Sequence, residues 1–197
     1  TSKSLFKYVP CPEFRQSLFS ETPGSVPPQG SSREGNHMCI VVMMCGVCGA
    51  GKTTYAKCLE KDGFVRLSID EEIWAAYGRC GIDFPEEQYD SVSEAAEARL
   101  RGKIPGLVAE GKNIVLDFSF WSRKKRADYR KLIEEAGGQP VLIYLKADKK
   151  LLKQRLEKRN RSIHANSPFV ITDEILEHHY RCFQEPHGEG EQIILQK

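Results

Sequence analysis

The sequence carries little net charge and no long apolar run. Its 29 lysines and arginines are almost balanced by 27 aspartates and glutamates, which leaves a net charge of +2 at pH 7. This balance gives no electrostatic reason to expect nucleic acid as a ligand. No apolar stretch reaches the length that spans a bilayer, and the first residues lack the basic-then-apolar pattern of a secretory signal. We therefore expect a cytoplasmic protein without a membrane partner.

The cysteines show no sign of pairing. There are seven of them, an odd number, and several lie inside apolar runs, which fits free thiols in a reducing compartment. Cys45 and Cys48 form a C-x-x-C pair, but no second cysteine or histidine pair stands at zinc-ligand spacing. We expect two small side chains packed beneath a loop, with a metal or dithiol site as the weaker alternative.

The chain changes character at Met38. Residues 1–37 are rich in Ser, Pro and Gly and show no sustained apolar periodicity, so we expect a flexible leader, either native or added for expression. Residues 38–197 are enough for one domain with its own core. Catalysis should not need the leader.

One motif dominates this domain, and it reads Gly46-Val-Cys-Gly-Ala-Gly-Lys-Thr53. It meets the pattern G-x-x-x-x-G-K-[ST] and stands between an apolar run and a helical pattern, which is the context that a phosphate-binding loop requires. The glycines let successive backbone N–H groups point at a phosphate chain. Lys52 would bridge the β- and γ-phosphates, and the Thr53 hydroxyl would bind Mg²⁺. We expect ATP and Mg²⁺ as ligands, with the nucleotide held by Gly46, Val47, Cys48, Gly49, Ala50, Gly51, Lys52, Thr53 and Thr54.

Strand and helix patterns alternate along the domain. This alternation predicts an α/β fold with a parallel sheet of about five strands and helices on both faces. Ligands of such sheets bind at the carboxyl ends of the strands. The expected strands are Cys39 to Met44, Phe64 to Asp70, Asn113 to Phe120, Pro140 to Asp148 and Glu191 to Lys197.

Two acids fall at the ends of expected strands. Asp70 ends "FVRLSID", where a carboxylate faces the γ-phosphate, and we interpret it as the general base. The alternative is an N-cap for the following helix. Asp117 ends "NIVLD", the position from which an acid enters the Mg²⁺ shell. A hydrogen bond to the acceptor hydroxyl, a cap and a surface position are the alternatives for Asp117.

Three arginines and one tryptophan are further candidates. Arg155 and Arg159 share one helix face ahead of a polar segment from Arg159 to Phe169. They could close over the phosphates with a mobile loop, although a solvated basic helix is the usual alternative. Arg126, which follows Asp117, raises the same choice. Trp121, beside the polar run "SRKKR", is the least core-like aromatic residue and could contact the acceptor.

Taken in order, these residues resemble a group of small P-loop kinases. The group includes phage-type polynucleotide 5′-kinases, chloramphenicol phosphotransferase-like enzymes, zeta-toxin kinases and predicted AAA-type kinases. The resemblance covers Met38 to the C-terminus and implies a three-layer P-loop kinase fold with a small helical lid. The sequence departs from the pattern of this group just after Asp70. Polynucleotide kinases and their relatives often carry an arginine there that can bind the acceptor, whereas this sequence has Glu71 to Trp74. The resemblance implies Asp70 as the base and Lys52 and Thr53 as ligands of the nucleotide and Mg²⁺. Asp117 matches the acid at the end of the third strand, and Arg126 resembles the arginine that follows that acid on the next helix. Arg155 and Arg159 match the paired arginines before the lid, one of which contacts the nucleotide phosphates, and Phe183 and Pro186 match the tail near the adenine.

The sequence therefore predicts an ATP-dependent kinase. It would move the γ-phosphate of ATP to a hydroxyl of a small molecule or a nucleic-acid end, with Asp70, Lys52 and Arg159 as catalytic residues. The alternative is a nucleotide-binding or hydrolysing regulatory module without an acceptor. A GTPase switch would need an N-K-x-D motif, and "YLKADKK" lacks the asparagine. A P-loop kept only as scaffold is the third alternative, which the intact Lys52, Thr53 and Asp70 argue against.

Overall fold

The computed structural model describes residues 38–161, 164–166 and 169–197. The chain separates into two units, Thr1–Asn36 and His37–Lys197, and every described residue belongs to the second. The expected leader lies outside the described residues, so its character stays a prediction. In the described part of the chain, no helix combines the length and the apolar character that a membrane crossing needs.

The described residues form one parallel sheet in the order β2-β3-β1-β4-β5. Every neighbouring pair of these strands is parallel, which confirms the α/β fold expected from the alternation. All six residues of the central strand β1 are buried, as a near-continuous apolar run in a covered parallel strand should be. The strands are β1 (Ile40–Cys45), β2 (Val65–Ser68), β3 (Ile114–Asp117), β4 (Gln139–Lys146) and β5 (Gln192–Leu195).

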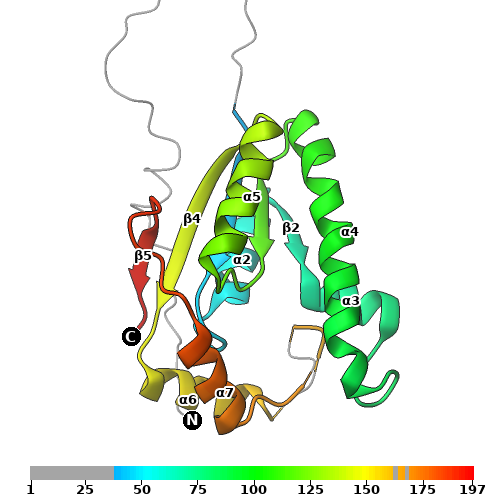
Figure 1. The fold of residues 1–197 in the computed structure, drawn as a ribbon, viewed down its shortest axis with the longest axis vertical. Coiled ribbons are helices and arrows are strands. Elements are labelled where there is room, and N and C mark those ends of the chain that lie inside the picture. The colour runs from blue at the N-terminus through cyan, green and yellow to red at the C-terminus, as the bar shows by residue number, and fades with distance from the viewer. Residues whose placement is uncertain (1–37, 162–163, 167–168) are drawn as a thin grey trace, which may run out of the picture. The chain divides into compact units, whose positions relative to one another are not determined.

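Helices cover both faces of this sheet, and Figure 1 shows α5 in front of it and α2 behind it. The longest helix of the described residues, α4, continues through Pro105. Leu100, Ile104 and Val108 recur at i, i+4 and i+8 on its buried side, and their packing holds the helix together despite the missing N–H. The helices are α2 (Lys52–Lys61), α3 (Ile69–Tyr77), α4 (Tyr89–Ala109), α5 (Arg123–Glu135), α6 (Lys149–Arg159) and α7 (Asp173–Cys182).

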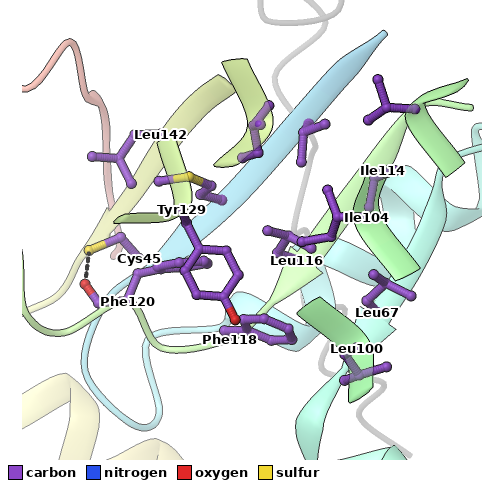
Figure 2. Close-up of a cluster of buried hydrophobic side chains, with 14 of the residues drawn as sticks. Cys45, Leu67, Leu100, Ile104, Ile114, Leu116, Phe118, Phe120, Tyr129 and Leu142 are labelled. Atoms are coloured by element: carbon purple, nitrogen blue, oxygen red, sulfur yellow. Dashed lines mark hydrogen bonds between the residues drawn. The ribbon is translucent and has the colours of Figure 1, made fainter. Parts of the chain in front are cut away.

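The main core lies between the sheet and helices α4 and α5 (Figure 2). Alternate residues of β1, namely Val41, Met43 and Cys45, belong to this cluster, as the two-residue period of a strand requires. Tyr129 of α5 packs edge-on against the ring of Phe120, with ring centroids 5.0 Å apart. This packing fixes the segment that follows β3, which lies next to the phosphate-loop motif.

Candidate functional site

The motif from Gly46 to Thr53 forms the turn between β1 and α2. Three of its glycines have positive φ angles: 148° at Gly46, 82° at Gly49 and 99° at Gly51. Side chains rarely adopt such angles. Gly46 also lacks room, because a Cβ there would lie 2.8 Å from the carbonyl oxygen of Leu145. The shape of the loop therefore depends on glycine at these positions.

Lys52 folds back over this loop. Its Nζ donates to the carbonyl oxygens of Gly46 at 2.8 Å and Val47 at 3.0 Å. Burial lowers the pKa of Lys52, and the nearby Cys48 and Asp117 oppose that effect. The ammonium group is thus held across the loop by two carbonyl groups that it can exchange for other acceptors.

Asp117 ends β3, as predicted, and lies against α2 and β2. The Thr53 hydroxyl donates to its Oδ1 at 3.2 Å, and Nη1 of Arg66 donates to its Oδ2 at 2.9 Å. Burial raises the pKa of Asp117, while Arg66 and Lys52 counteract this increase. A hydroxyl beside a carboxylate is an oxygen donor set of the kind that Mg²⁺ prefers, so these two residues fit the metal role expected of them.

Arg66 carries no motif, and the sequence did not identify it as a site residue. Its only signal is a charged residue within the short strand Val65–Ser68, whose carboxyl end lies beside that of β3. The side chains of Arg66 and Asp117 are each 3% exposed. A buried ion pair beside the phosphate loop is therefore a feature that the structure adds.

Asp70 is the second residue of α3 rather than the last residue of a strand. β2 ends at Ser68, whose Oγ accepts from the N–H of Glu71 and caps the helix. The predicted strand end was wrong by two residues, because Ser68 and Glu71 form the start of a helix that overrides the apolar run. The N-cap alternative for Asp70 is also wrong, since Ser68 occupies that position.

The environment of Asp70 joins it to the phosphate loop. Tyr89 donates a hydrogen bond to its Oδ1 at 3.4 Å. Burial raises the pKa of Asp70, and the charges of Arg159 and Lys52 lower it in turn. Lys52 and Arg159, the other two residues expected to be catalytic, thus act on Asp70 through their charges.

Both candidate arginines of α6 lie near the loop. Arg155 donates through Nη1 to the carbonyl oxygen of Ala50 at 3.3 Å and to Oε1 of Gln196 at 3.2 Å. Arg159 is the last residue of α6, and its charge acts on Asp70 and Cys48. The shared helix face predicted for the pair therefore faces the phosphate loop.

Arg126 is buried and forms hydrogen bonds within the protein. Its Nε and Nη2 donate to the two carboxylate oxygens of Glu189, both at 2.7 Å. Its Nη1 donates to the carbonyl oxygens of Phe120 at 2.9 Å and Gln184 at 2.8 Å. The residue is only 1% exposed and ties the segment after β3 to the chain after α7. The acceptor contact expected of Arg126 stays a prediction.

The segment after β3 lies against the phosphate loop. The carbonyl oxygen of Ser119 accepts from the N–H of Gly46 at 3.3 Å. Phe120 has a φ of 42°, which is strained for a side-chain-bearing residue, and Trp121 follows with 47% exposure. Trp121 is thus presented to solvent, as expected of a residue outside the core.

The C-x-x-C cysteines are both free thiols. Sγ of Cys45 is buried and donates to the carbonyl oxygen of Phe120 at 3.4 Å (Figure 2). Burial raises the pKa of Cys45 to about 12 and also raises that of Cys48. Within the described ranges, no three His, Cys, Asp or Glu residues are grouped so that they could hold a metal ion.

The expected lid, Arg159 to Phe169, is described except at 162–163 and 167–168. Its described part contacts α3 and the start of α4. Nδ2 of Asn166 donates to Oε1 of Glu71 at 2.8 Å, and the ring of Phe169 lies edge-on to that of Tyr89 with centroids 5.0 Å apart. The segment thus lies on the Asp70 side of the site, and its movement stays a prediction.

A comparison with protein families finds a match over most of the chain. The family model described as "AAA domain" matches residues 41–186. One curated relative, the UPF0200 protein PAE1629 of Pyrobaculum aerophilum, is 27% identical over 125 residues. These residues are 64% of this chain and 69% of that protein.

Solved structures share the fold at low identity. A candidate kinase from Chloroflexus aurantiacus is 18% identical, with a TM-score of 0.65 over 82% of this chain and 86% of that one. A gluconokinase from Sinorhizobium meliloti is 19% identical, with a TM-score of 0.53 over 80% and 82%. A chain of the Pnkp1/Rnl/Hen1 RNA repair complex is 17% identical, with a TM-score of 0.61 over 78% and 46%. These likenesses confirm the fold class that the motifs predicted.

Proposed function

The chain belongs to the AAA domain family, and from that premise we propose that it is an ATP-dependent phosphotransferase acting on a hydroxyl group. One observation carries this proposal. Asp70 is not a helix cap, and its carboxylate lies within the electrostatic influence of Lys52 and Arg159. A carboxylate held among the cations of a phosphate loop suits a base that acts on an acceptor next to the γ-phosphate.

The phosphate loop would hold the donor nucleotide. Backbone N–H groups from Gly46 to Thr54 would bind the phosphates together with the N-terminal end of α2. Lys52 would exchange its two carbonyl acceptors for phosphate oxygens. Arg155, which contacts the loop at Ala50, would add charge along the phosphate chain.

Thr53 and Asp117 would hold Mg²⁺. Their neighbouring oxygens provide two ligands of the right chemistry, and phosphate oxygens and water would complete the shell. When bound, the ion neutralises charge that develops on the phosphates. Arg66 keeps one oxygen of Asp117 engaged and leaves the other beside the Thr53 hydroxyl.

Asp70 would accept the proton of the acceptor hydroxyl. The hydroxyl oxygen then bonds to the γ-phosphorus, the bond from that phosphorus to the bridging oxygen breaks, and ADP leaves with the bridging oxygen's negative charge. Burial moves the pKa of Asp70 upward, towards the pH at which a base works best. Lys52 and Arg159 would stabilise the charge on the transferred group.

The acceptor is a small molecule with a hydroxyl or a nucleic-acid end. The named neighbours include both a gluconokinase and a chain of an RNA repair complex, so the fold serves both settings. The exposed Trp121 supports an acceptor with an apolar or planar part.

A γ-phosphate transfer screen tests the proposal. Nucleosides, 5′-hydroxyl oligonucleotides, aminoglycosides, nucleotide sugars and other alcohols would be offered with ATP and Mg²⁺ to the wild type and to Lys52→Ala. Transfer that disappears in the variant supports the phosphotransferase. Hydrolysis of ATP that no acceptor increases would favour the regulatory module instead, and unchanged turnover in Lys52→Ala would contradict both.

A further inference from the structure

Arg66 of β2 joins three elements and a loop segment around the phosphate loop. Its Nε donates to Oε2 of Glu60 in α2 at 3.2 Å, and its Nη1 donates to Oδ2 of Asp117 at the end of β3 at 2.9 Å. Its Nη2 forms an ion pair with Glu71 in the first turn of α3. Nη1 also lies 3.5 Å from Oδ1 of Asn166. With only 3% of its side chain exposed, the guanidinium is a buried centre of charge.

Stability alone gives a weak reason for an arginine here. Burying an ion pair removes both charges from water, and apolar residues of the same size often hold a fold equally well. Val65 and Leu67, on the opposite face of β2, pack in the main core, whereas the face of Arg66 is occupied by carboxylates. The acceptors of Arg66 therefore indicate its use, and two of them adjoin the reacting groups.

The first of these acceptors is Asp117. The two oxygens of its carboxylate accept from different donors: Oδ2 accepts from Arg66, and Oδ1 accepts from the Thr53 hydroxyl at 3.2 Å. If Arg66 did not hold Oδ2, the carboxylate could rotate about its terminal torsion, which is broad in aspartate. Arg66 thus keeps Oδ1 beside the hydroxyl with which it would share a metal ion.

The second acceptor is Glu71, which follows Asp70 directly. Glu71 occupies the first turn of α3, where its N–H binds Ser68 and its carboxylate binds Arg66 and Asn166. These contacts fix the turn from both its backbone and its side chain. Because Asp70 belongs to the same turn, its position relative to the phosphate loop depends on this ion pair.

We propose that Arg66 is a positioning residue that aligns the metal-directed carboxylate of Asp117 and, through Glu71, the turn that carries Asp70. The inference rests on the proposed function, because it assigns those two acids their roles. Lysine at position 66 would keep the charge but lose the fork, because the three donors of an ammonium group are all on one nitrogen. It could not reach three carboxylates on three elements as the three nitrogens of the guanidinium do.

The test measures ADP affinity by calorimetry with and without Mg²⁺, so that it does not depend on turnover. In the wild type, Mg²⁺ should tighten ADP binding. In Arg66→Lys, this metal-dependent gain should fall by about tenfold or more, the usual effect of losing a residue that orients a metal ligand. ADP affinity without Mg²⁺ should change by less than about threefold, since the phosphate loop itself is intact.

One further variant separates the effect on Asp117 from the effect on Asp70, and a second variant is a control. Glu71→Gln breaks the ion pair to α3 but leaves Arg66 on Asp117, so the Mg²⁺ gain should survive while kcat falls. Arg79→Lys is the matched control, because Arg79 pairs with Asp83 on the exposed surface at 2.9 Å and should change neither quantity. A purely structural role of Arg66 would lower the melting temperature without changing the Mg²⁺ gain.

The outcomes distinguish the inference from the function beneath it. A wild type that binds ADP equally well with and without Mg²⁺ would overturn the proposed function, and the inference with it. A wild type with a clear gain that a folded Arg66→Lys keeps within twofold would overturn the inference alone. Loss of the gain in Glu71→Gln as well would show that the two acids are not held separately, which also contradicts the proposal.

Discussion

Replacing Arg126 with alanine should destabilise the protein far more than its place in a basic run suggests. The change removes four hydrogen bonds, two of them to the carboxylate of Glu189. It leaves that carboxylate, whose side chain is 12% exposed, and two carbonyl oxygens without this donor. Breaking a buried pair by removing one partner costs about 3–5 kcal/mol. Because Glu189 keeps some access to water, we expect the lower end, about 3 kcal/mol.

Urea unfolding measures this loss, and a thermal melt should show a fall of about 6–12 °C for that value. Arg123→Ala is the matched control, because Arg123 lies 4.0 Å from the same carboxylate but is 72% exposed. An exposed pair of this kind contributes less than about 1 kcal/mol. If Arg126→Ala loses less than about 1 kcal/mol and instead raises the KM of an acceptor strongly, the side chain serves the substrate and the structural argument is refuted.

Four other perturbations test the site and the leader. Asp70→Asn should lower kcat by about 10²–10⁴-fold, and it should melt at a higher temperature than the wild type at pH 7. Burial raises the pKa of Asp70 in the folded state, so ionisation of this carboxyl opposes folding at neutral pH. The higher melting temperature of the variant should therefore disappear as the pH falls towards 3.8, the ordinary pKa of the group. A variant that melts below the wild type at pH 7 would contradict this reasoning. Gly46→Ala should weaken ADP binding because its Cβ meets a carbonyl oxygen, whereas Gly63→Ala, with φ also positive but open space around it, should leave binding unchanged; equal effects would count against the argument. Amide exchange in residues 159–169 should slow when ADP and Mg²⁺ bind, and exchange that is already slow without them would argue against a lid. A chain that begins at Met38 should keep its turnover and ATP affinity, and a folded but inactive product would move the domain boundary.

The parts of the fold that could be predicted are those with local signals. The buried run of β1 and the glycines of the loop each combine a pattern with a stop, and the structure has them where expected. The strand expected over Asn113 to Phe120 ends at Asp117, three residues earlier than predicted. The end of β2 was placed two residues too late, because "LSID" satisfies both an apolar strand and the start of a helix. Whether the strand or the helix forms at these residues depends on the hydrogen bond between Ser68 and Glu71. A serine three residues before a glutamate is a weaker signal in the sequence than the apolar run, so the prediction followed the run.

The parts that could not be predicted depend on contacts between distant residues. Arg66 and Asp117 are 51 positions apart, and Arg126 and Glu189 are 63 apart. An arginine in a basic run looks the same in sequence whether it faces solvent, a phosphate or a buried glutamate. The charge of Arg126 therefore suggested a ligand, while its burial depends on a segment that the motif does not contain.

The bond between Arg126 and Glu189 also affects the order in which the chain can fold during translation. Arg126 is synthesised 63 residues before its partner, an interval of roughly 3–13 s at ribosomal speeds of about 5–20 residues per second. Until Gln184 and Glu189 are both made, the strained turn at Phe120 lacks its tie to Gln184 and the guanidinium of Arg126 lacks its carboxylate partner. The nascent domain can form β1 and α2 early, but the contacts beside its phosphate loop are completed only after Glu189 is made. A ribosome stalled before residue 189 would thus carry a recognisable fold without a finished site.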